Sequence, residues 1–415
     1  MKATNVWYER NWRWFVLGTL FLATFLNYFD RQTLANAIGP ISEEFGLSNA
    51  QRGNLLSAFI YVYAFCHIFI GFILDRLDRI RIFYMIMVSG WALTTILMGL
   101  VDSYRELLYL RYLLGFFEAL NFPLCILLIA RIFPAQERSF ATGIFSSGGV
   151  LATLTSPYLV VYFSNNFDWR YSFIVSGLLA LLWIIPWLII FRKPKQRALS
   201  WPERSKEPLG KSILESSKRI FSKPSFWIVA TIGIGIIPLM YFITQWLPTV
   251  MTQALHRAYD SKLPTNLAVI FVMQNFGMWV GGYLVMVFAR KHTILNARKL
   301  AIGIGFVLIV SILIMTRAQS FLVSMIILSM FNFGIGMIIA NQHSFKQDVD
   351  KENVGTVAAL IGFIETSMAA FVVQRVGFIT EETHDYAPVF WLLVGFAGIC
   401  LIMSLVLNKK WMKIE

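Results

Sequence analysis

The sequence is poor in charge. Asp, Glu, Lys and Arg together make up only 14% of its 415 residues, while hydrophobic residues make up 57%. Soluble domains carry about 25% charged and about 45–50% apolar residues. A chain with so little charge cannot cover a water-exposed surface. This excludes an ordinary soluble domain and indicates a protein that is surrounded by lipid.

Cysteine and histidine are scarce as well. The 3 cysteines lie in apolar runs without CxxC spacing, and the 5 histidines are scattered without an HExxH pair. An intramembrane enzyme would need such a metal pair or a nucleophile with its base. We therefore predict that the protein is not an enzyme and uses no metal and no cofactor. No signal-peptide cleavage site follows the basic N-terminus, so we expect it to be retained as the first span.

Long apolar runs fill most of the chain. About 20 apolar residues cross a hydrocarbon core roughly 30 Å thick, and twelve runs of suitable length recur: 15–37, 55–74, 82–101, 107–133, 140–163, 171–191, 226–249, 266–289, 300–316, 321–345, 354–380 and 389–407. We predict an all-α membrane protein with twelve transmembrane helices in two pseudo-symmetric six-helix bundles, residues 1–191 and 224–415. A basic cytoplasmic linker, residues 192–223, joins them.

The basic residues are unevenly placed. Lys and Arg number 36 against 23 Asp and Glu, a net charge of +13, which in a soluble protein would suggest a nucleic-acid partner. Here the basic residues crowd the N-terminus and alternate loops, as the positive-inside rule describes. We therefore predict a lipid bilayer and no nucleic acid as partner. We expect both termini to be cytoplasmic and the chain to be a monomer in a bacterial inner membrane.

The loop after the second run, residues 71–81, carries a charged motif. It resembles the loop signature of the major facilitator superfamily, G-x-L-x-D-R-x-G-R, with Asp78 in place of the second glycine. The resemblance implies a gating motif of Gly71, Asp75, Arg76 and Arg79, in which the glycine permits close helix contact and the acid binds arginine side chains. The alternative is a charged loop at the membrane edge.

Other stretches resemble one family of that superfamily, the anion:cation symporters, which includes hexuronate, aldonate, sialic acid and vesicular glutamate carriers. The first run has Asn27–Tyr28–Phe29–Asp30–Arg31, similar to N-Y-x-D-R, and the fourth has Arg111 and Glu118, as in R-x-x-x-G-x-x-E. The seventh contains Trp246–Leu247–Pro248. The resemblance implies the twelve-helix major facilitator fold, alternating access and proton-coupled uptake of a small organic anion such as a sugar acid.

Four charged residues lie inside the predicted spans: Asp30, Arg31, Arg111 and Glu118. An ionised side chain costs at least about 2.5–3.5 kcal/mol at the centre of a membrane helix, so each should face a partner or a cavity. Their depths overlap, and Arg111 and Glu118 share one helix face. We predict Asp30 and Glu118 as proton sites, Arg111 as their switching partner and Arg31 as the planar fork for a substrate carboxylate. The alternative is a set of static ion pairs between helices.

Uncharged polar residues in the spans are candidate substrate contacts. Pro248 predicts that the seventh span unwinds near Gln245, one turn earlier, and exposes polar groups there. For every candidate the alternative is a packing or interfacial role. The predicted substrate contacts besides Arg31 are Tyr28, Tyr63, Gln245, Asn332 and Asn341.

Glu365 is an acid in the otherwise apolar eleventh run, where the resembling carriers have neutral polar side chains. We predict a role in proton coupling, as a third proton site. Alternatively, Glu365 pairs with Arg375 or binds an amino group of the substrate. The last of these would make the substrate zwitterionic.

Two further alternatives are an exporter and a non-transporting nutrient sensor. The fifth run, at 143–149, does not reproduce the G-x-x-x-G-P-x-x-G pattern typical of antiporters. A sensor normally adds a long soluble tail, and the tails of this chain are short. Uptake therefore stays the preferred interpretation.

Overall fold

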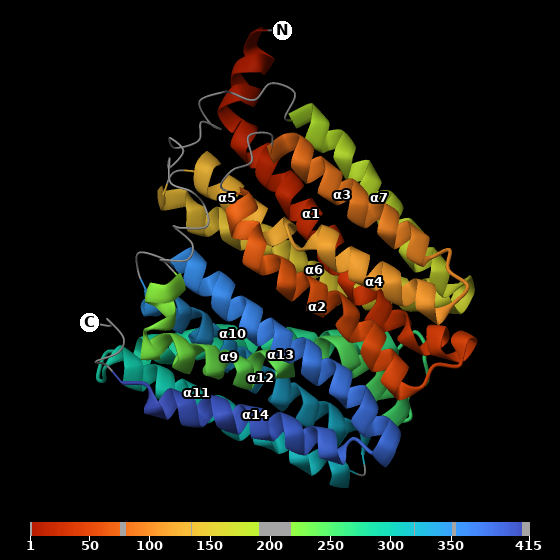
Figure 1. Cartoon of the computed structure of the whole chain (residues 1–415), viewed down its shortest axis with the longest axis vertical. Coiled ribbons are helices and arrows are strands. Elements are labelled where there is room, and N and C mark those ends of the chain that lie inside the picture. The colour runs from red at the N-terminus through yellow and green to blue at the C-terminus, as the bar shows by residue number, and fades with distance from the viewer. Residues whose placement is uncertain are drawn as a thin grey trace. The chain divides into compact units, whose positions relative to one another are not determined.

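The fold is helical throughout the part of the chain that the structure describes. Figure 1 presents the computed structural model, which describes residues 2–74, 80–133, 135–190, 217–318, 320–350 and 354–408. Every regular element in these ranges is a helix, and they contain no strand. A bilayer offers the backbone no hydrogen-bond partners, so apolar runs form helices, which satisfy their own N–H and C=O groups.

The first half of the chain begins with a very long helix and contains one interrupted span. Its helices, in the described residues, are α1 (Lys2–Phe45), α2 (Asn49–Leu74), α3 (Ile80–Met98), α4 (Tyr104–Glu118), α5 (Asn121–Ile132), α6 (Ala135–Asn166) and α7 (Trp169–Ile190). The predicted fourth span is divided into α4 and α5 at Ala119 and Leu120. Pro123 explains the break, because it has no N–H for the Ala119 carbonyl and its ring clashes with that carbonyl.

The second half continues with helices that end in altered turns. The described elements are α9 (Pro224–Thr249) with a π-helical turn (Val250–Ala254), α10 (Leu263–Phe288), α11 (Ile294–Val310) with a 3-10 turn (Ser311–Arg317), α12 (Phe321–Val349), α13 (Val354–Thr383) and α14 (Ala387–Val406). Ten helical stretches of the described chain are long and apolar enough to cross a membrane. α1 and α2 are not among the ten, although they have 44 and 26 residues.

The prediction that the seventh span unwinds near Gln245 is wrong. α9 stays α-helical through Thr249, and only the following turn widens to a π-helix. Trp246 is fully buried, and its indole N–H donates to the carbonyl of Val373 at 2.9 Å. This bond attaches α9 to α13, and the helix stays continuous through Pro248, which removes only one backbone N–H.

By their contacts, the helices divide into two compact units. Unit 1 comprises Met1–Ala37 and Phe69–Lys206, and unit 2 comprises Ile38–Ile68 and Glu207–Glu415. In unit 1, α3 packs along α4 and α7; in unit 2, α12 packs along α9, α10 and α11, and α9 packs along α13 and α14. Unit 1 therefore holds the four charges of the first and fourth spans, while unit 2 holds Glu365.

Glycines bring the helix backbones into contact within each unit. In unit 1, a Cβ atom at Gly177 of α7 would lie 2.7 Å from the carbonyl oxygen of Ala92 on α3. In unit 2, a Cβ atom at Gly281 of α10 would lie 2.8 Å from the Cα atom of Met337 on α12. Side chains do not fit at such separations, so small residues allow these membrane helices to approach closely.

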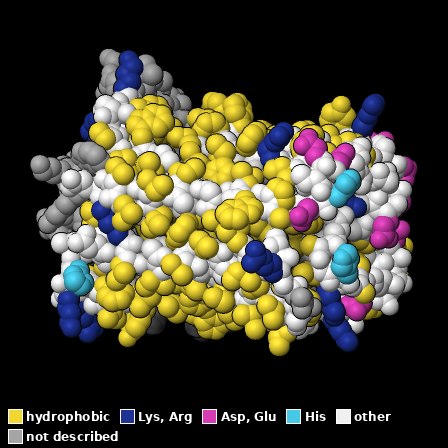
Figure 2. Space-filling view, turned by 90° about the horizontal axis from the view of Figure 1, so that it is seen from below, with side chains coloured by type: hydrophobic (Ala, Val, Ile, Leu, Met, Phe, Trp, Pro, Cys, Tyr) yellow, Lys and Arg dark blue, Asp and Glu magenta, His cyan; other side chains and the backbone are white. Residues whose placement is uncertain are grey.

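The side chains are distributed as in a protein surrounded by lipid. Large apolar residues point outward, among them Val307, 69% exposed, and Ile189, 64% exposed. On the face in Figure 2, hydrophobic side chains cover most of the middle, and the acidic side chains gather at one end. Polar residues such as Asn27, Asp30 and Glu118 are instead fully buried. Buried polar groups inside an apolar exterior are typical of functional sites in membrane proteins.

Candidate functional site

The centre of unit 1 contains an ion pair between two spans. The Nε atom of Arg31, on α1, donates to Oε2 of Glu118 at 2.8 Å. Glu118 is the last residue of α4, at the break that Pro123 causes, and its side chain is fully buried. The guanidinium of Arg31 lies 4.9 Å from the ring centroid of Tyr28 and is 11% exposed. A nearly buried guanidinium is thus held by a carboxylate and a π face.

Asp30 and Arg111 complete this group of charges. Asp30 is fully buried and accepts a hydrogen bond from the Thr95 hydroxyl at 3.3 Å, whereas its Oδ1 atom has no hydrogen-bond partner among the described residues. Arg111 is 1% exposed, and the charges of Glu118, Arg31 and Asp30 act on it. The structure therefore brings together the four charges of the first and fourth spans within one unit.

These four residues are two acids and two bases, so the group is electrically neutral when all are ionised. Glu118 takes Arg31 as an ion-pair partner, while the sequence predicted an exchange with Arg111. Arg31 therefore has an acidic partner as well as its predicted role toward a substrate carboxylate. Such an arrangement can exchange one anionic partner of an arginine for another.

Asn27 is a candidate site residue that the sequence analysis did not select. Its side chain is fully buried, and neither of its amide atoms has a hydrogen-bond partner in the described part of the chain. It lies three and four residues before Asp30 and Arg31, hence on the same face of α1. That i, i+3, i+4 spacing is visible in the sequence and could have identified it. A buried amide without partners suits a polar ligand that supplies them.

The predicted polar contacts in unit 2 differ in their surroundings. Gln245 is 5% exposed, and its Oε1 atom has no partner in the described residues. Asn332 donates to the Ile270 carbonyl at 2.7 Å, while its Oδ1 atom is likewise without a described partner. Asn341 donates to Met337 of its own helix at 2.8 Å. Tyr63 stacks on the ring of Phe59, with centroids 5.4 Å apart. Gln245 and Asn332 thus retain acceptors for a ligand.

Glu365 has a cationic partner that the sequence analysis did not identify. Its carboxylate, on α13, forms an ion pair with Lys346 of α12 and accepts a hydrogen bond from Gln342 Nε2 at 2.7 Å. Arg375, which the sequence offered as partner, instead places its guanidinium 5.5 Å from the ring of Phe378. Glu365 and Lys346 are only 4% and 7% exposed. Unit 2 therefore has a buried ion pair of its own.

A family model settles what kind of protein this is. The model described as the Major Facilitator Superfamily matches residues 20–373. The chain belongs to the major facilitator superfamily. It is thus a multi-pass membrane transporter with an all-α fold and not an enzyme, as the sequence predicted.

Curated relatives match nearly the whole transporter. A D-galactonate transporter of Escherichia coli is 24% identical over 415 residues, covering 95% of this chain and 94% of the relative. A hexuronate transporter of Escherichia coli is 26% identical over 417 residues, covering 96% and 94%. Hexuronate and aldonate carriers are the relatives that the sequence motifs implied.

Solved structures are similar in fold. A bacterial homologue of the human lysosomal transporter Spinster, in an inward-facing and unoccupied conformation, has a TM-score of 0.75 at 19% identity, covering 95% of this chain and 94% of that one. A mutant of the nucleoside transporter NupG has a TM-score of 0.70 at 12% identity, covering 94% and 99%. At these identities the similarity establishes the major facilitator fold of the transporter.

The predicted gating motif and the pocket of unit 2 contribute little to the candidate substrate site. Asp75, Arg76 and Arg79 of the predicted gating motif lie outside the described residues, and Gly71 lies in the last turn of α2. A pocket of about 580 Å³ in unit 2 is lined mainly by apolar residues of α10, α11 and α12, such as Met273, with Asn266 and Ser329 as its polar members. That pocket contains none of the predicted site residues, and its lining suits lipid or apolar groups rather than an anion.

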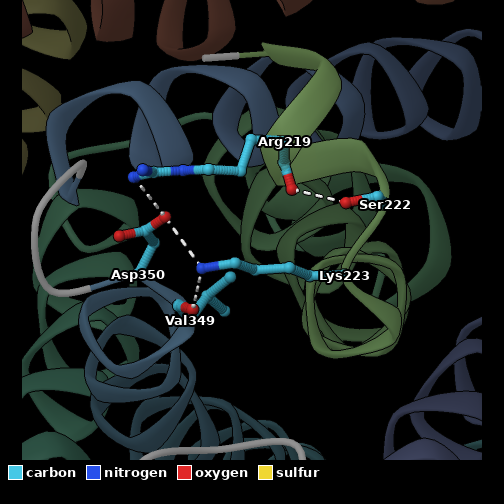
Figure 3. A network of polar contacts seen from close by, with 5 residues as sticks. All are labelled: Arg219, Ser222, Lys223, Val349 and Asp350. Carbon is cyan, nitrogen blue, oxygen red and sulfur yellow. Dashed lines mark hydrogen bonds and ion pairs between the residues drawn. The ribbon is translucent and has the colours of Figure 1, made fainter. Parts of the chain in front are cut away.

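A polar network holds the segment before α9 against the end of α12 (Figure 3). Asp350 accepts from Lys223 at 2.8 Å and from Arg219 at 3.3 Å, and Lys223 also reaches the Val349 carbonyl at 3.5 Å. The Ser222 hydroxyl donates to the Arg219 carbonyl at 2.8 Å. Within unit 2, the end of the predicted basic linker is thus attached to the end of α12 through Asp350.

Proposed function

We propose that the transporter takes up a small organic anion, a sugar acid or similar carboxylate, together with protons. The observation that carries this proposal is the neutral buried group of Asp30, Arg31, Arg111 and Glu118. An entering carboxylate adds a negative charge to this group, and an uncompensated buried charge is costly. One proton on Asp30 or Glu118 restores neutrality, so anion and proton bind together more favourably than the anion binds alone.

Arg31 and Glu118 supply the exchange step in this proposal. A proton on Glu118 weakens its ion pair with Arg31, and the guanidinium then binds the substrate carboxylate through its planar fork. Asp30 is a second proton site, because its carboxylate is fully buried and its Oδ1 atom has no hydrogen-bond partner among the described residues. Arg111 compensates whichever acid is ionised. Alternating access then opens the site, with its bound anion and proton, to the other side of the membrane.

The substrate class rests on two further observations. The reported relatives are named as D-galactonate and hexuronate transporters, and such acids carry several hydroxyl groups. Asn27, Gln245 and Asn332 have buried amide atoms without described partners, which suit hydroxyl groups. Tyr28, beside Arg31, and Tyr63 are the proposed aromatic contacts, and Asn341 is a further polar contact. A zwitterionic substrate is less favoured, because Glu365 already has Lys346 as its cation.

The predicted architecture belongs to the same proposal. Two six-helix bundles, residues 1–191 and 224–415, rock about the substrate, and the basic linker 192–223 and both termini lie on the cytoplasmic side of an inner membrane. Gly71, Asp75, Arg76 and Arg79 act at the cytoplasmic mouth. The functional unit is a monomer. The charge distribution of the loops supports this orientation.

Uptake by the purified protein in liposomes tests the proposal. With an imposed inward pH gradient, we expect D-galactonate or D-glucuronate to accumulate, and Asp30→Asn and Glu118→Gln each to abolish gradient-driven accumulation. Glu382→Gln, at an exposed carboxyl near the end of α13, is the matched control and should accumulate substrate like the wild type. If Asp30→Asn and Glu118→Gln both retain full accumulation, the assignment of proton coupling to unit 1 is wrong.

A further inference from the structure

The ion pair of unit 2 sits in a space that a glycine provides. A Cβ atom at Gly233 of α9 would collide with the Glu365 carboxylate and would lie 3.0 Å from Nε2 of Gln342. Any larger residue at this position would therefore displace the carboxylate from Lys346 or from Gln342. The packing of α9 is shaped around a charged group, although an apolar contact would stabilise a helix interface at lower cost.

Lys346 is the cation that pairs with Glu365 in the described chain. α2 also contacts α13, through Gly53 and Gly377. α2 carries Arg52 beside that contact, and its His67 contacts the ring of Tyr63. α9 and α14, which pack on α13, contain no Asp, Glu, His, Lys or Arg. Their other titratable groups are Tyr241 and Cys400. α12 adds Asp348, which pairs with Arg298 of α11, and His343, on which the charge of Lys346 acts. The charge of Glu365 is therefore balanced by Lys346 alone among these neighbours.

Gln342 can serve Glu365 in both protonation states. It now donates from Nε2 to Oε2 of Glu365 at 2.7 Å. Its Oε1 atom is fully buried and has no hydrogen-bond partner in the described residues. After rotation of its amide, the same side chain can accept the O–H of a protonated Glu365. Gln342 and Lys346 are four residues apart and lie on one face of α12.

We propose that Lys346 is a second anion-binding residue of the transporter and that Glu365 is its exchangeable counterion. A proton from the solution binds the Glu365 carboxylate, the acid hydrogen bonds to Gln342, and the Lys346 ammonium binds a carboxylate of the substrate instead. The net charge of the site is zero before and after this exchange. An anion that arrived without the proton would leave a buried negative charge, so binding and protonation are coupled in unit 2.

This inference rests on the proposed function, since it takes the same class of substrate. It differs from that function in placing a proton on Glu365 and a carboxylate on Lys346, both in unit 2, whereas the proposed function places the proton on Asp30 or Glu118 and the carboxylate on Arg31. The background variant Asp30→Asn/Arg31→Gln/Arg111→Gln/Glu118→Gln separates the two sites, because it removes the titratable acids of unit 1 and leaves neither arginine without its counterion. Proton uptake that persists in this background must come from elsewhere.

Calorimetric titration of the full-length protein with D-galactonate, D-glucuronate and galactarate tests the inference. We expect Lys346→Gln to weaken binding at least about tenfold, the loss of a charge-assisted contact, and Lys346→Arg to keep binding within about threefold. Lys299→Gln, which removes a lysine of α11 that bonds the Leu405 carbonyl, is the matched control and should bind like the wild type.

Titration in buffers of different ionisation enthalpy counts the protons taken up. In the background variant, Glu365→Gln should abolish this uptake.

The double variant Glu365→Gln/Lys346→Gln controls for folding, because it leaves neither buried charge without its partner. We expect its thermal midpoint to stay near that of the wild type while its affinity falls as in Lys346→Gln. If the wild type binds these anions and Lys346→Gln binds them equally tightly, this inference is wrong, and the proposed function is unaffected. A wild-type protein that binds none of the three anions overturns the proposed function, and this inference with it.

Discussion

Arg31 of α1 and Glu118 of α4 are 87 residues apart in the sequence and form an ion pair of 2.8 Å inside unit 1. Glu118 is fully buried and Arg31 is 11% exposed, so water does little to weaken their attraction. This ion pair holds α1 and α4 together. It also occupies Arg31, the residue that we propose to bind the substrate carboxylate. Removing one partner and removing both should therefore have different consequences.

Replacement of Arg31 alone should destabilise the protein. Arg31→Gln leaves the buried carboxylate of Glu118 without this partner, which should lower the free energy of unfolding by about 3–5 kcal/mol. The measurement is the thermal midpoint of the purified protein. The double variant Arg31→Gln/Glu118→Gln should regain most of the loss, since no uncompensated charge remains at this pair. A double variant as unstable as Arg31→Gln would contradict this account.

Asn27 should matter for substrate and not for stability. Asn27→Ala removes two buried amide atoms that have no described partner, so the free energy of unfolding should be unchanged or slightly higher. The KM for D-galactonate uptake should rise several-fold. Asn275→Ala is the matched control, because Asn275 bonds Phe271 of its own helix, and its KM should stay at the wild-type value. Equal KM values for both variants would remove Asn27 from the site.

Much of the fold could be predicted from the sequence, because a bilayer imposes the length and polarity of each span. The apolar runs correspond to the helices that the structure describes, and the interruption of the fourth span could have been read from Pro123. The course of α9 could not be predicted from the sequence. Pro248 suggests a break, but the hydrogen bond from Trp246 to Val373 of α13 depends on a neighbour that is distant in the sequence.

The candidate site was predicted unevenly. Asp30, Arg31, Arg111 and Glu118 stand out because charge is rare in apolar runs, and the structure brings them together. Lys346 was missed because the predicted tenth span ends at residue 345, whereas α12 continues to Val349. The predicted run ends before Lys346 because the residues that follow, up to Asp350, are mostly polar or charged. The helix does not, since Glu365 from another span compensates the lysine.

Gly233→Ala should destabilise unit 2 through steric conflict. The added methyl group would collide with the Glu365 carboxylate, and overpacking of this kind costs about 1–3 kcal/mol. Gly395→Ala is the matched control, because a Cβ atom there meets nothing within 4 Å. The control should be neutral or slightly stabilising, since alanine favours helix by up to about 1 kcal/mol over glycine. Equal thermal midpoints for the two variants would mean that Glu365 has other room to occupy.

The network around Asp350 should respond to salt. The carboxylate is 5% exposed, but its partners Arg219 and Lys223 are 51% and 32% exposed, and exposed pairs contribute only about 0.2–1 kcal/mol each. Asp350→Asn should therefore lower the thermal midpoint slightly in dilute buffer. The difference should shrink in 1 M NaCl, where the screening length falls to about 3 Å.

The salt dependence separates charge from hydrogen bonding at this position. The amide introduced by Asp350→Asn keeps an oxygen acceptor for Lys223 and Arg219 but has no charge. If the thermal midpoint of Asp350→Asn stays below that of the wild type in 1 M salt, the carboxylate acts through the geometry of its hydrogen bonds and not through its charge. Glu382→Gln, at an exposed carboxyl of α13, reports the effect of removing one surface charge. The deficit of Asp350→Asn in dilute buffer should exceed that of Glu382→Gln, because only Asp350 joins two bases from the segment before α9 to the end of α12.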